Sequence, residues 1–451
     1  MTTQEPNAAG PEPRPAAARF IFLLNCVYVA ALTAVLVCGT AYSVEQLARH
    51  NVLVPADKNG TPIDMVDFLH FYQAGQLVID PATRDRVYDP EIQLAWQRAY
   101  LKPGSIDKAF YIQYMPFVFP LMVPIGLLPA EAAFLLWTAL SLIAGLVGIL
   151  LLNSLVRRSY RQLAAFAIAM LVSLPTFVGF LKGQLALALF LIFSIYWWGL
   201  RTGRDFPAGI ALCLSTVKPH YTLFVFVPAL LERRWKLLAV AACFEVALLG
   251  LAGFTIGWAN VVNYPAILMS IEASKSVIGV NPAKQVCLRA VLNQFMLPEP
   301  ALRLSMAIMI VGWIGAFLLW RQALRWQANG RPDSDRALSW CMALTVLICL
   351  VVSPHTHLYD WTSLALVAWL TLPALSLSAL AEEGPLALRI WTGILLLYPL
   401  LSWLAFLGGA ALRTDVPWAT LSQLLLHLVL LVSGAIYWLA LWRRRRLETI
   451  H

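Results

Sequence analysis

Two acids and an imidazole occur close together in the residues that follow the first long apolar segment. Asp64, Asp67 and His70 are spaced by three residues, so they lie on one face if the chain is helical from Asp64 onward. Tyr72 stands beside them. A carboxylate held among aromatic side chains at a membrane surface can act as a general base toward a hydroxyl group. The same spacing is also typical of a helix N-terminus, where acids complement the helix dipole.

A lysine interrupts the apolar stretch 206–231 midway, and both ends of that stretch adjoin arginines. Lys218 therefore lies deep in the bilayer, where a charged side chain costs roughly 2.5–3.5 kcal/mol and usually lines a polar cavity or meets a partner. Pro219 ends one helix at this point, so the stretch predicts two short helices that meet at Lys218. We expect Lys218 to bind an anionic lipid headgroup. The alternatives are a lysine that snorkels to the outer interface or one that pairs with a structural acid.

Three histidines form two further polar clusters. His220 follows Pro219, while His355 and His357 are two residues apart with Asp360 close behind. Two histidines and a carboxylate can hold a metal, but the H-E-x-x-H spacing is absent, so we predict no metal site. The imidazoles can equally donate to a phosphate, and Asp360 is expected to cap the helix after it.

One more cluster is formed by Lys182, Gly183 and Gln184 between two apolar segments. Gln184 is a candidate substrate contact or a helix-packing amide, and Gly183 is expected to form a tight turn.

The composition excludes a soluble globular protein. Of 451 residues, 60% are hydrophobic and 13% charged, and the mean hydropathy is +0.71. Repeated apolar runs predict an all-α polytopic membrane protein. Residues 117–128, bracketed by prolines, are too short to span and are expected to be interfacial or re-entrant. We expect about twelve transmembrane helices in all. Ten of them cover residues 20–45, 131–154, 162–181, 237–257, 304–322, 338–352, 361–379, 387–409 and 418–441, together with a helix that follows Gln184 and ends at Arg201; the other two are the short helices within 206–231.

The arginines predict the orientation of these helices. They cluster in short loops that the positive-inside rule places in the cytoplasm, which makes nucleic-acid binding a poor explanation of the net charge of +9. Both termini are then cytoplasmic, and the four polar clusters meet at the outer face. The basic clusters are Arg157, Arg158 and Arg161; Arg201 and Arg204; Arg233, Arg234 and Lys236; Arg321, Arg325, Arg331 and Arg336; and Arg443 to Arg446.

The predicted organisation is a single membrane domain. It covers residues 19–441, between a disordered N-terminus (1–18) and a basic tail (442–451). Its outer face carries two loops: 47–130, in which amphipathic helices are expected, and 258–303. Six of the seven cysteines fall inside apolar runs, so no disulfide framework is indicated.

The order of several short motifs resembles glycosyltransferase family 87, the bacterial mannosyltransferases that depend on polyprenol-phosphate-mannose and have the GT-C fold. One position departs from the family's pattern, because Leu185 and Ala186 stand where an asparagine often follows the Gly-Gln pair. The motifs are Asp67 with Phe71-Tyr72, Tyr88-Asp89, Tyr114-Met115-Pro116 through Pro124, Lys182-Gly183-Gln184, Gly203-Arg204 with Ala208-Gly209, Lys218-Pro219, Arg233-Arg234-Trp235 and Ser353-Pro354-His355.

This resemblance implies transfer of a sugar, mannose above all, from a polyprenyl monophosphate to a hydroxyl of a lipid or glycan acceptor. The reaction would proceed with inversion at the outer face of the bacterial inner membrane, among membrane lipids. The lipid-linked sugar would be a co-substrate, with no nucleotide and no cofactor, and the need for a divalent metal is left open. Asp67 matches the family's catalytic acid position and would be the general base. Lys218 with His355 or His357 would stabilise the leaving phosphate.

Two other classes of function remain open from the sequence. A transporter or flippase of a lipid-linked sugar explains the helices and Lys218 but leaves the long aromatic outer loop without a role. The lack of an evident internal repeat counts mildly against a transporter of two equivalent halves. A membrane assembly subunit without catalysis is the third hypothesis.

Overall fold

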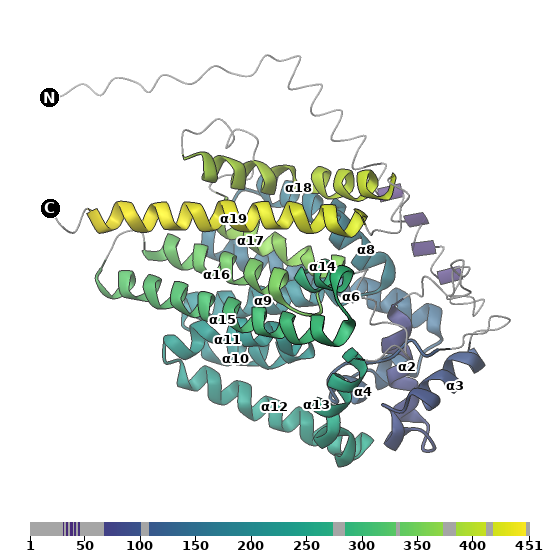
Figure 1. Ribbon diagram of the computed structural model, residues 1–451. Helices are drawn as coiled ribbons and strands as arrows, with labels where there is room; N and C mark the ends of the chain where they lie inside the picture. The colour runs from purple at the N-terminus through teal and green to yellow at the C-terminus, as the bar shows by residue number, and fades with distance from the viewer. Residues whose placement is uncertain are drawn as a thin grey trace, which may run out of the picture.

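The structure is a computed structural model that describes residues 67–100, 108–273, 285–330, 334–372, 385–411 and 418–447, with scattered positions between 30 and 45. Over these ranges it is a helical bundle (Figure 1), with one isolated bridge between Gln285 and His357. The elements are α2 (Phe68–Ile79), η1 (Arg84–Arg86), α3 (Pro90–Tyr100), α4 (Val118–Leu121), α5 (Val123–Gly126), α6 (Ala130–Val156), α7 (Tyr160–Val172), α8 (Leu174–Lys182), α9 (Ala186–Thr202), α10 (Asp205–Leu214), η2 (Ser215–Val217), α11 (Pro219–Leu231), α12 (Trp235–Ile256), α13 (Trp258–Ala273), α14 (Leu288–Phe295), α15 (Pro298–Ala328), α16 (Ser334–Val352), η4 (Leu358–Ser363), α17 (Leu364–Thr371), α18 (Leu386–Ala411) and α19 (Trp418–Leu447).

Six of the described helices are long and apolar enough to cross a membrane: α6, α12, α15, α16, α18 and α19. A seventh candidate is α7 with α8, whose axes differ by 64° at the break around Ser173. Pro175 lies in the first turn of α8, where its missing N–H costs nothing. The prediction of an all-α polytopic membrane protein is confirmed.

The predicted number of about twelve crossings exceeds what the described helices give. Most of residues 20–45 lie outside the described part of the chain, α9 is at the lower limit of a bilayer crossing, and α10 and α11 are shorter. The expected helix 361–379 begins as η4 and continues as α17, which ends at Thr371. The expected outer loop 258–303 contains α13 and α14, and α15 already begins at Pro298.

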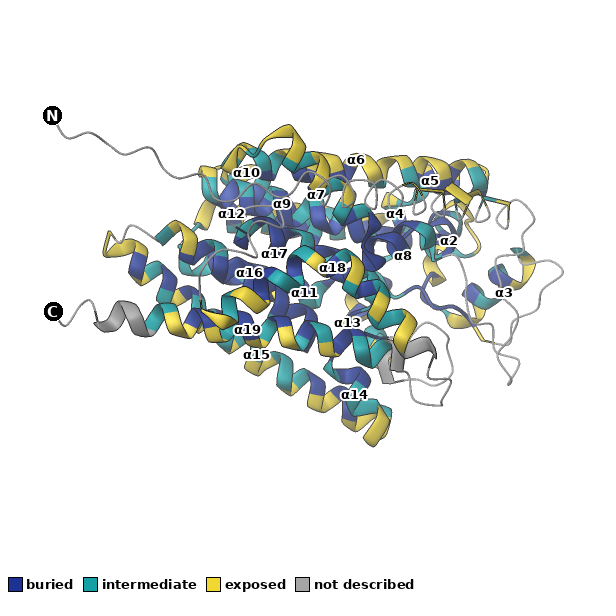
Figure 2. Ribbon diagram, turned by 90° about the horizontal axis from the view of Figure 1, so that it is seen from above, coloured by how far each residue is buried: buried dark blue, intermediate teal, exposed yellow. Residues whose placement is uncertain are grey.

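Burial is graded across the bundle (Figure 2). Most side chains of α16 are buried, including Trp340, whereas α6 and α15 carry exposed leucine and isoleucine side chains along one face. A helix that is apolar all round belongs in the centre, and one with an exposed apolar face contacts lipid. In Figure 1, α12, α15, α16 and α19 run roughly parallel, and α2, α3, α4 and α13 gather at one end.

The stretch predicted as two short helices forms a hairpin with Lys218 at its tip, which confirms that prediction. Lys218 has a non-helical backbone (φ −127°, ψ 83°) and is the N-cap of α11, whose first residue is Pro219. The Lys218 N–H still bonds the carbonyl of Ser215 at 3.0 Å, which closes η2. Both arms of the hairpin pack against α12.

Three fully buried glutamines join α2, α3 and the segment around Phe110. Gln73 of α2 donates to the carbonyl of Gln93 on α3 at 3.0 Å, and Gln97 donates to Gln73 Oε1 at 2.7 Å. Gln97 also bonds both the N–H and the C=O of Phe110, and Gln93 Oε1 accepts from the N–H of Ile112 at 2.8 Å. Side-chain amides thus satisfy the backbone groups of Phe110 and Ile112 in this extended segment. We call Gln73, Gln93 and Gln97 the glutamine frame.

The end of α8 is fixed by a glycine. Gly183 has φ +67°, and the turn shows both bonds of a Schellman motif: Gly183 N to Phe180 O at 3.1 Å and Gln184 N to Gly179 O at 2.7 Å. A Cβ at Gly183 would lie 2.6 Å from the Cβ of Phe68, the first residue of α2. The predicted tight turn is therefore also a close contact that sets Gln184 beside the start of α2.

Gly183→Ala should destabilise the protein more than Gly203→Ala, which is a matched control. Gly203 ends α9 with φ +73°, and a Cβ there meets nothing within 4 Å. In both variants the left-handed backbone conformation of the new alanine lowers the free energy of unfolding by about 1 kcal/mol. Only Gly183→Ala adds the clash with Phe68, which lowers it by about 1–3 kcal/mol more. Thermal unfolding in detergent measures the difference. Equal shifts of the two midpoints would contradict the close contact at Gly183.

Candidate functional site

The carboxylate of Asp67 lies at the start of α2. It lies at the helix N-terminus, as the dipole alternative predicted, but it makes no side-chain capping bond. Instead, Gln184 Nε2 donates to Asp67 Oδ2 at 2.9 Å. Gln184 is 5% exposed and Asp67 is partly exposed. The amide that comes after α8 therefore orients an acid from the first outer loop.

Lys218 and Asp360 form a buried ion pair between Nζ and Oδ1, with Lys218 6% and Asp360 1% exposed. The other carboxylate oxygen, Oδ2, accepts from the backbone N–H of His357 at 2.9 Å, within a capping box at the start of η4. The predicted capping role of Asp360 is confirmed. Of the alternatives for Lys218, pairing with a structural acid is the one realised in this structure, and its ammonium also lies 5.1 Å from the ring centre of Tyr359.

The predicted histidines gather beside this pair. Nε2 of His355 lies 3.2 Å from Nε2 of His357 and 2.9 Å from Nε2 of Gln113. His355 Nδ1 lies 3.3 Å from Gln285 Nε2, and the ring of His220 is centred 6.3 Å from that of His355. Over the described ranges, no group of three or more His, Cys, Asp or Glu side chains has a metal-binding arrangement.

Residues 285–289, which lead into α14 and form its first turn, hold the histidine segment in place. The N–H of Val286 bonds the carbonyl of Thr356 at 2.8 Å, next to the isolated bridge between Gln285 and His357. The guanidinium of Arg289, 1% exposed, donates to the carbonyl of Pro354 at 3.2 Å. The second outer loop therefore positions the histidines through backbone contacts.

Two tyrosines connect Asp67 with the Lys218–Asp360 pair. Burial raises the pKa of Tyr114, and the charges of Asp67 and Asp360 raise it further, while a hydrogen bond with Gln184 acts in the opposite direction. Burial also raises the pKa of Tyr359, followed by the charges of Asp360 and Asp67. Because α8, which ends beside Gln184, also packs against η4, which contains Asp360, these residues belong to one site.

The remaining predicted residues divide into three cases. His70 lies near Asp67; burial lowers its pKa, and the charge of Asp67 partly offsets this effect. Tyr72 turns away, donating to the carbonyl of Leu128 at 3.1 Å and packing on Trp96. Asp64 lies outside the described residues.

Four residues of this site were not among the predicted ones: Gln113, Tyr114, Arg289 and Tyr359. Tyr114 stands in a motif that carried the family resemblance, and Tyr359 lies between His357 and Asp360, so a signal existed for both. Gln113 and Arg289 had none beyond their place in outer loops. Their roles come from contacts between segments that are distant in sequence.

The arrangement provides two kinds of chemistry. An oriented carboxylate that is partly exposed can accept a proton from a hydroxyl group. Imidazole N–H groups and an ammonium can stabilise negative charge on a leaving phosphate. Both sets of groups meet at the end of the bundle away from the arginine clusters.

Comparison with known protein families identifies a family for this chain. The family model of glycosyltransferase family 87 matches residues 111–354, more than half of the chain. The matched range includes Tyr114, Gln184 and Lys218; Asp67 precedes it, and it ends one residue before His355. No curated protein matches the chain.

His357 should make stability depend on pH. Burial lowers its pKa well below 6.5, as do His355, Lys218 and Lys182, against the opposing charge of Asp360. In the unfolded chain His357 takes up a proton near pH 6.5, whereas in the folded protein its imidazole stays neutral. The contribution of His357 to stability is therefore present above pH 6.5 and is lost as the pH falls from 6.5 toward the folded pKa.

We therefore expect the unfolding midpoint in detergent to fall between pH 7.5 and 5.5, and to fall less in His357→Gln. One proton corresponds to about 1.4 kcal/mol per pH unit. The same pH dependence in His357→Gln and in the unaltered protein would contradict the burial of a neutral imidazole.

Proposed function

The chain belongs to glycosyltransferase family 87, and from this premise we propose that it transfers a sugar, mannose, from a polyprenyl monophosphate donor. The acceptor is a hydroxyl group of a lipid or glycan. The donor needs no nucleotide, and the reaction needs no resident cofactor. The location of the polar site supports this proposal. The site lies at one end of the helical bundle, where a lipid-linked donor can approach from the bilayer, as in the GT-C fold.

In the proposed reaction Asp67 is the general base. The acceptor oxygen attacks the anomeric carbon from the face opposite the phosphate, and its proton passes to the Asp67 carboxylate. The bond between the anomeric carbon and the phosphate oxygen breaks, the electron pair leaves with the phosphate, and the configuration inverts. Gln184 orients the base, with its Nε2 2.9 Å from Asp67 Oδ2. A base held within hydrogen-bond reach of its proton contributes typically 10²–10⁴-fold to the rate.

Lys218, His355 and His357 are proposed to stabilise the phosphate that leaves. Lys218 is already neutralised by Asp360, so hydrogen bonds from imidazole N–H groups complement its charge. His220 and His70 lie at the margins of the same cluster and would contact the donor or the acceptor.

The arginine clusters support the orientation of the site. The arginines at the ends of α6 and α9 lie at the opposite end of these helices from the site, and the positive-inside rule assigns that side to the cytoplasm. The proposed site then faces the periplasm or exterior of a bacterial inner membrane. The observation that carries the whole proposal is the hydrogen bond between Gln184 and Asp67. Tyr114 and Tyr359 feel the charges of both Asp67 and Asp360, the partner of Lys218.

Asp67→Asn should abolish transfer while leaving donor binding largely intact, because the amide keeps the size of the side chain but cannot accept the proton. We expect a loss of turnover of at least about 100-fold. The assay supplies polyprenyl-phosphate mannose and a lipid or glycan acceptor to purified protein. Asp80→Asn is the matched control, since Asp80 is an exposed carboxylate at the other end of α2, and it should keep full activity.

Full activity of Asp67→Asn would remove Asp67 from its proposed role. The transporter hypothesis would instead be favoured if labelled lipid moved across the membrane of proteoliposomes and no acceptor-dependent product formed, even though the family is one of transferases.

A double variant separates the structural and catalytic roles of Lys218. Lys218→Met leaves Asp360 buried and unpaired, which should cost about 3–5 kcal/mol of stability. Lys218→Met/Asp360→Asn removes both charges and should recover most of that stability, because the amide oxygen can still accept from the N–H of His357. Thermal unfolding and transfer are measured on the same samples. If the phosphate needs Lys218, the stable double variant stays inactive, whereas recovery of transfer would limit Lys218 to a structural role.

A further inference from the structure

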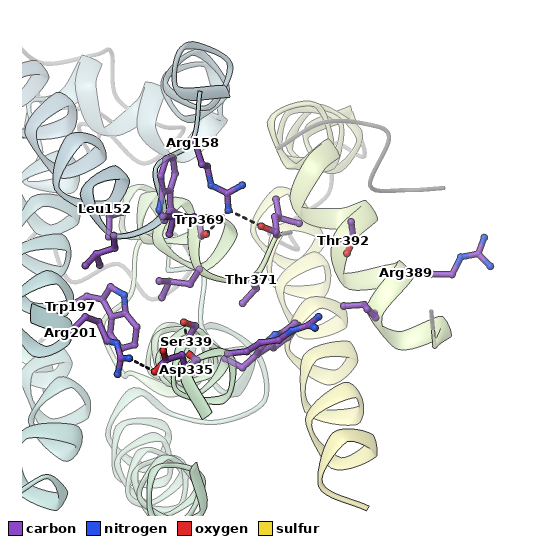
Figure 3. A pocket seen from close by; sticks show the side chains of 17 residues that line it. Leu152, Arg158, Trp197, Arg201, Asp335, Ser339, Trp369, Thr371, Arg389 and Thr392 are labelled. Carbon is purple, nitrogen blue, oxygen red and sulfur yellow. Dashed lines mark hydrogen bonds and ion pairs between the residues drawn. The ribbon is translucent and has the colours of Figure 1, made fainter. Parts of the chain in front are cut away.

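A cavity lies at the opposite end of the bundle from the proposed active site. It has a volume of about 690 Å³ and opens between the ends of α6, α9 and α17 and the beginnings of α16 and α18 (Figure 3). Both α6 and α9 begin beside the active site and end at this cavity, and 17 residues of α9 rise about 25 Å. The cavity is therefore separate from the Asp67 site, and any ligand it holds is independent of the proposed function.

The lining of this cavity is strongly basic. It includes four arginines, at 158, 201, 336 and 389, and one acid, Asp335. Arg201 pairs with Asp335 at 2.5 Å, and Arg158 donates to the carbonyls of Trp369 and Leu372 at 3.1 and 2.8 Å. The single carboxylate leaves the lining with three positive charges in excess. Guanidinium groups are the side chains best suited to bind phosphate oxygens.

Apolar and aromatic side chains lie between the arginines and form about half of the cavity lining. Three tryptophans line it, at 197, 340 and 369, together with Leu152, Leu155 and Leu388. A small inorganic anion makes no use of such walls, but the glycerol and upper acyl groups of a lipid do. Basic pockets between transmembrane helices on the cytoplasmic side are typical binding sites for anionic headgroups.

We propose that this cavity, the arginine pocket, binds the phosphate headgroup of an anionic phospholipid from the cytoplasmic leaflet. The phosphate accepts hydrogen bonds from Arg336 and Arg389 at the rim, while Arg158 stays engaged with the end of α17. Figure 3 shows the Arg389 side chain extended away from the other labelled residues, so Arg389 can meet a headgroup that approaches from the open side. A bound lipid would join α16, α17 and α18 at an end where residues 373–384 connect α17 to α18.

The test uses the full chain, purified in a neutral detergent and freed of lipid. The unfolding midpoint is measured while phosphatidylglycerol, phosphatidylcholine or inorganic phosphate is added, because a ligand that binds the folded protein raises the midpoint with concentration. We expect a rise with phosphatidylglycerol at concentrations where phosphatidylcholine and inorganic phosphate have little effect. In Arg336→Gln/Arg389→Gln the affinity should fall about thirtyfold, which corresponds to about 2 kcal/mol for two arginines.

The matched control is Arg204→Gln/Arg321→Gln. Both residues are exposed arginines at the same end of the bundle, and neither lines the pocket. This variant carries the same change of net charge and should keep the affinity of the unaltered protein. An equal loss in the two double variants, or no rise of the midpoint with phosphatidylglycerol, would overturn the proposal.

Two further outcomes identify other occupants. If inorganic phosphate raises the midpoint as much as the lipid does, and Arg336→Gln/Arg389→Gln removes that rise, the pocket is a site for a free phosphate. If phosphatidylglycerol binds only after Glu382→Gln/Glu383→Gln, the occupant is the chain's own acidic segment between α17 and α18. Either result would overturn the assignment to a lipid.

Discussion

The buried pair of Lys218 and Asp360 is the constraint on which the site end of the bundle depends. If either side chain of the pair were buried without its partner, the charge would destabilise the fold. The hairpin of α10 and α11, which carries Lys218, must therefore contact η4, which carries Asp360. The pair therefore determines where the histidine segment lies relative to the hairpin tip. It also explains why two short helices occupy a stretch that could have formed one crossing: the break at Pro219 is what presents the lysine.

Asp67 reaches this place by a separate set of contacts. The glutamine frame joins α2, α3 and the segment around Phe110, and Gly183 permits the close approach of the α8 turn to Phe68. Gln184 comes directly after Gly183 and bonds Asp67. Hydrogen bonds from buried side-chain amides thus hold α2 and α3 in place. This support is rigid because each buried backbone group left without its hydrogen bond costs about 1–3 kcal/mol.

The sequence was sufficient for the helical class, the break at Lys218 and the convergence of the polar clusters, because apolar length, proline and charge are local signals. It failed where the deciding contact joins distant segments. Asp67 has the pattern of a capping acid, and only the position of Gln184 shows that its carboxylate is engaged elsewhere. Tyr72 lies on α2 near His70, yet its hydroxyl bonds Leu128 away from the site. The number of crossings stays a prediction, because most of residues 20–45 lie outside the described part of the chain and α9, with 17 residues, is at the lower limit of a crossing.

The ion pair is asymmetric, and this bears on how a phosphate could be bound. Asp360 has two anchors, Lys218 and the backbone N–H of His357, so moving it would also break the start of η4. Lys218 holds its place through that carboxylate and the rings of Tyr221 and Tyr359, and its four-carbon chain has several rotatable bonds. A phosphate that arrives beside the histidines would therefore draw the ammonium toward itself while Asp360 stays in place. In the proposed reaction, Asp360 then holds the ammonium close to the site before the donor binds, which lowers the cost of bringing a cation to the leaving group.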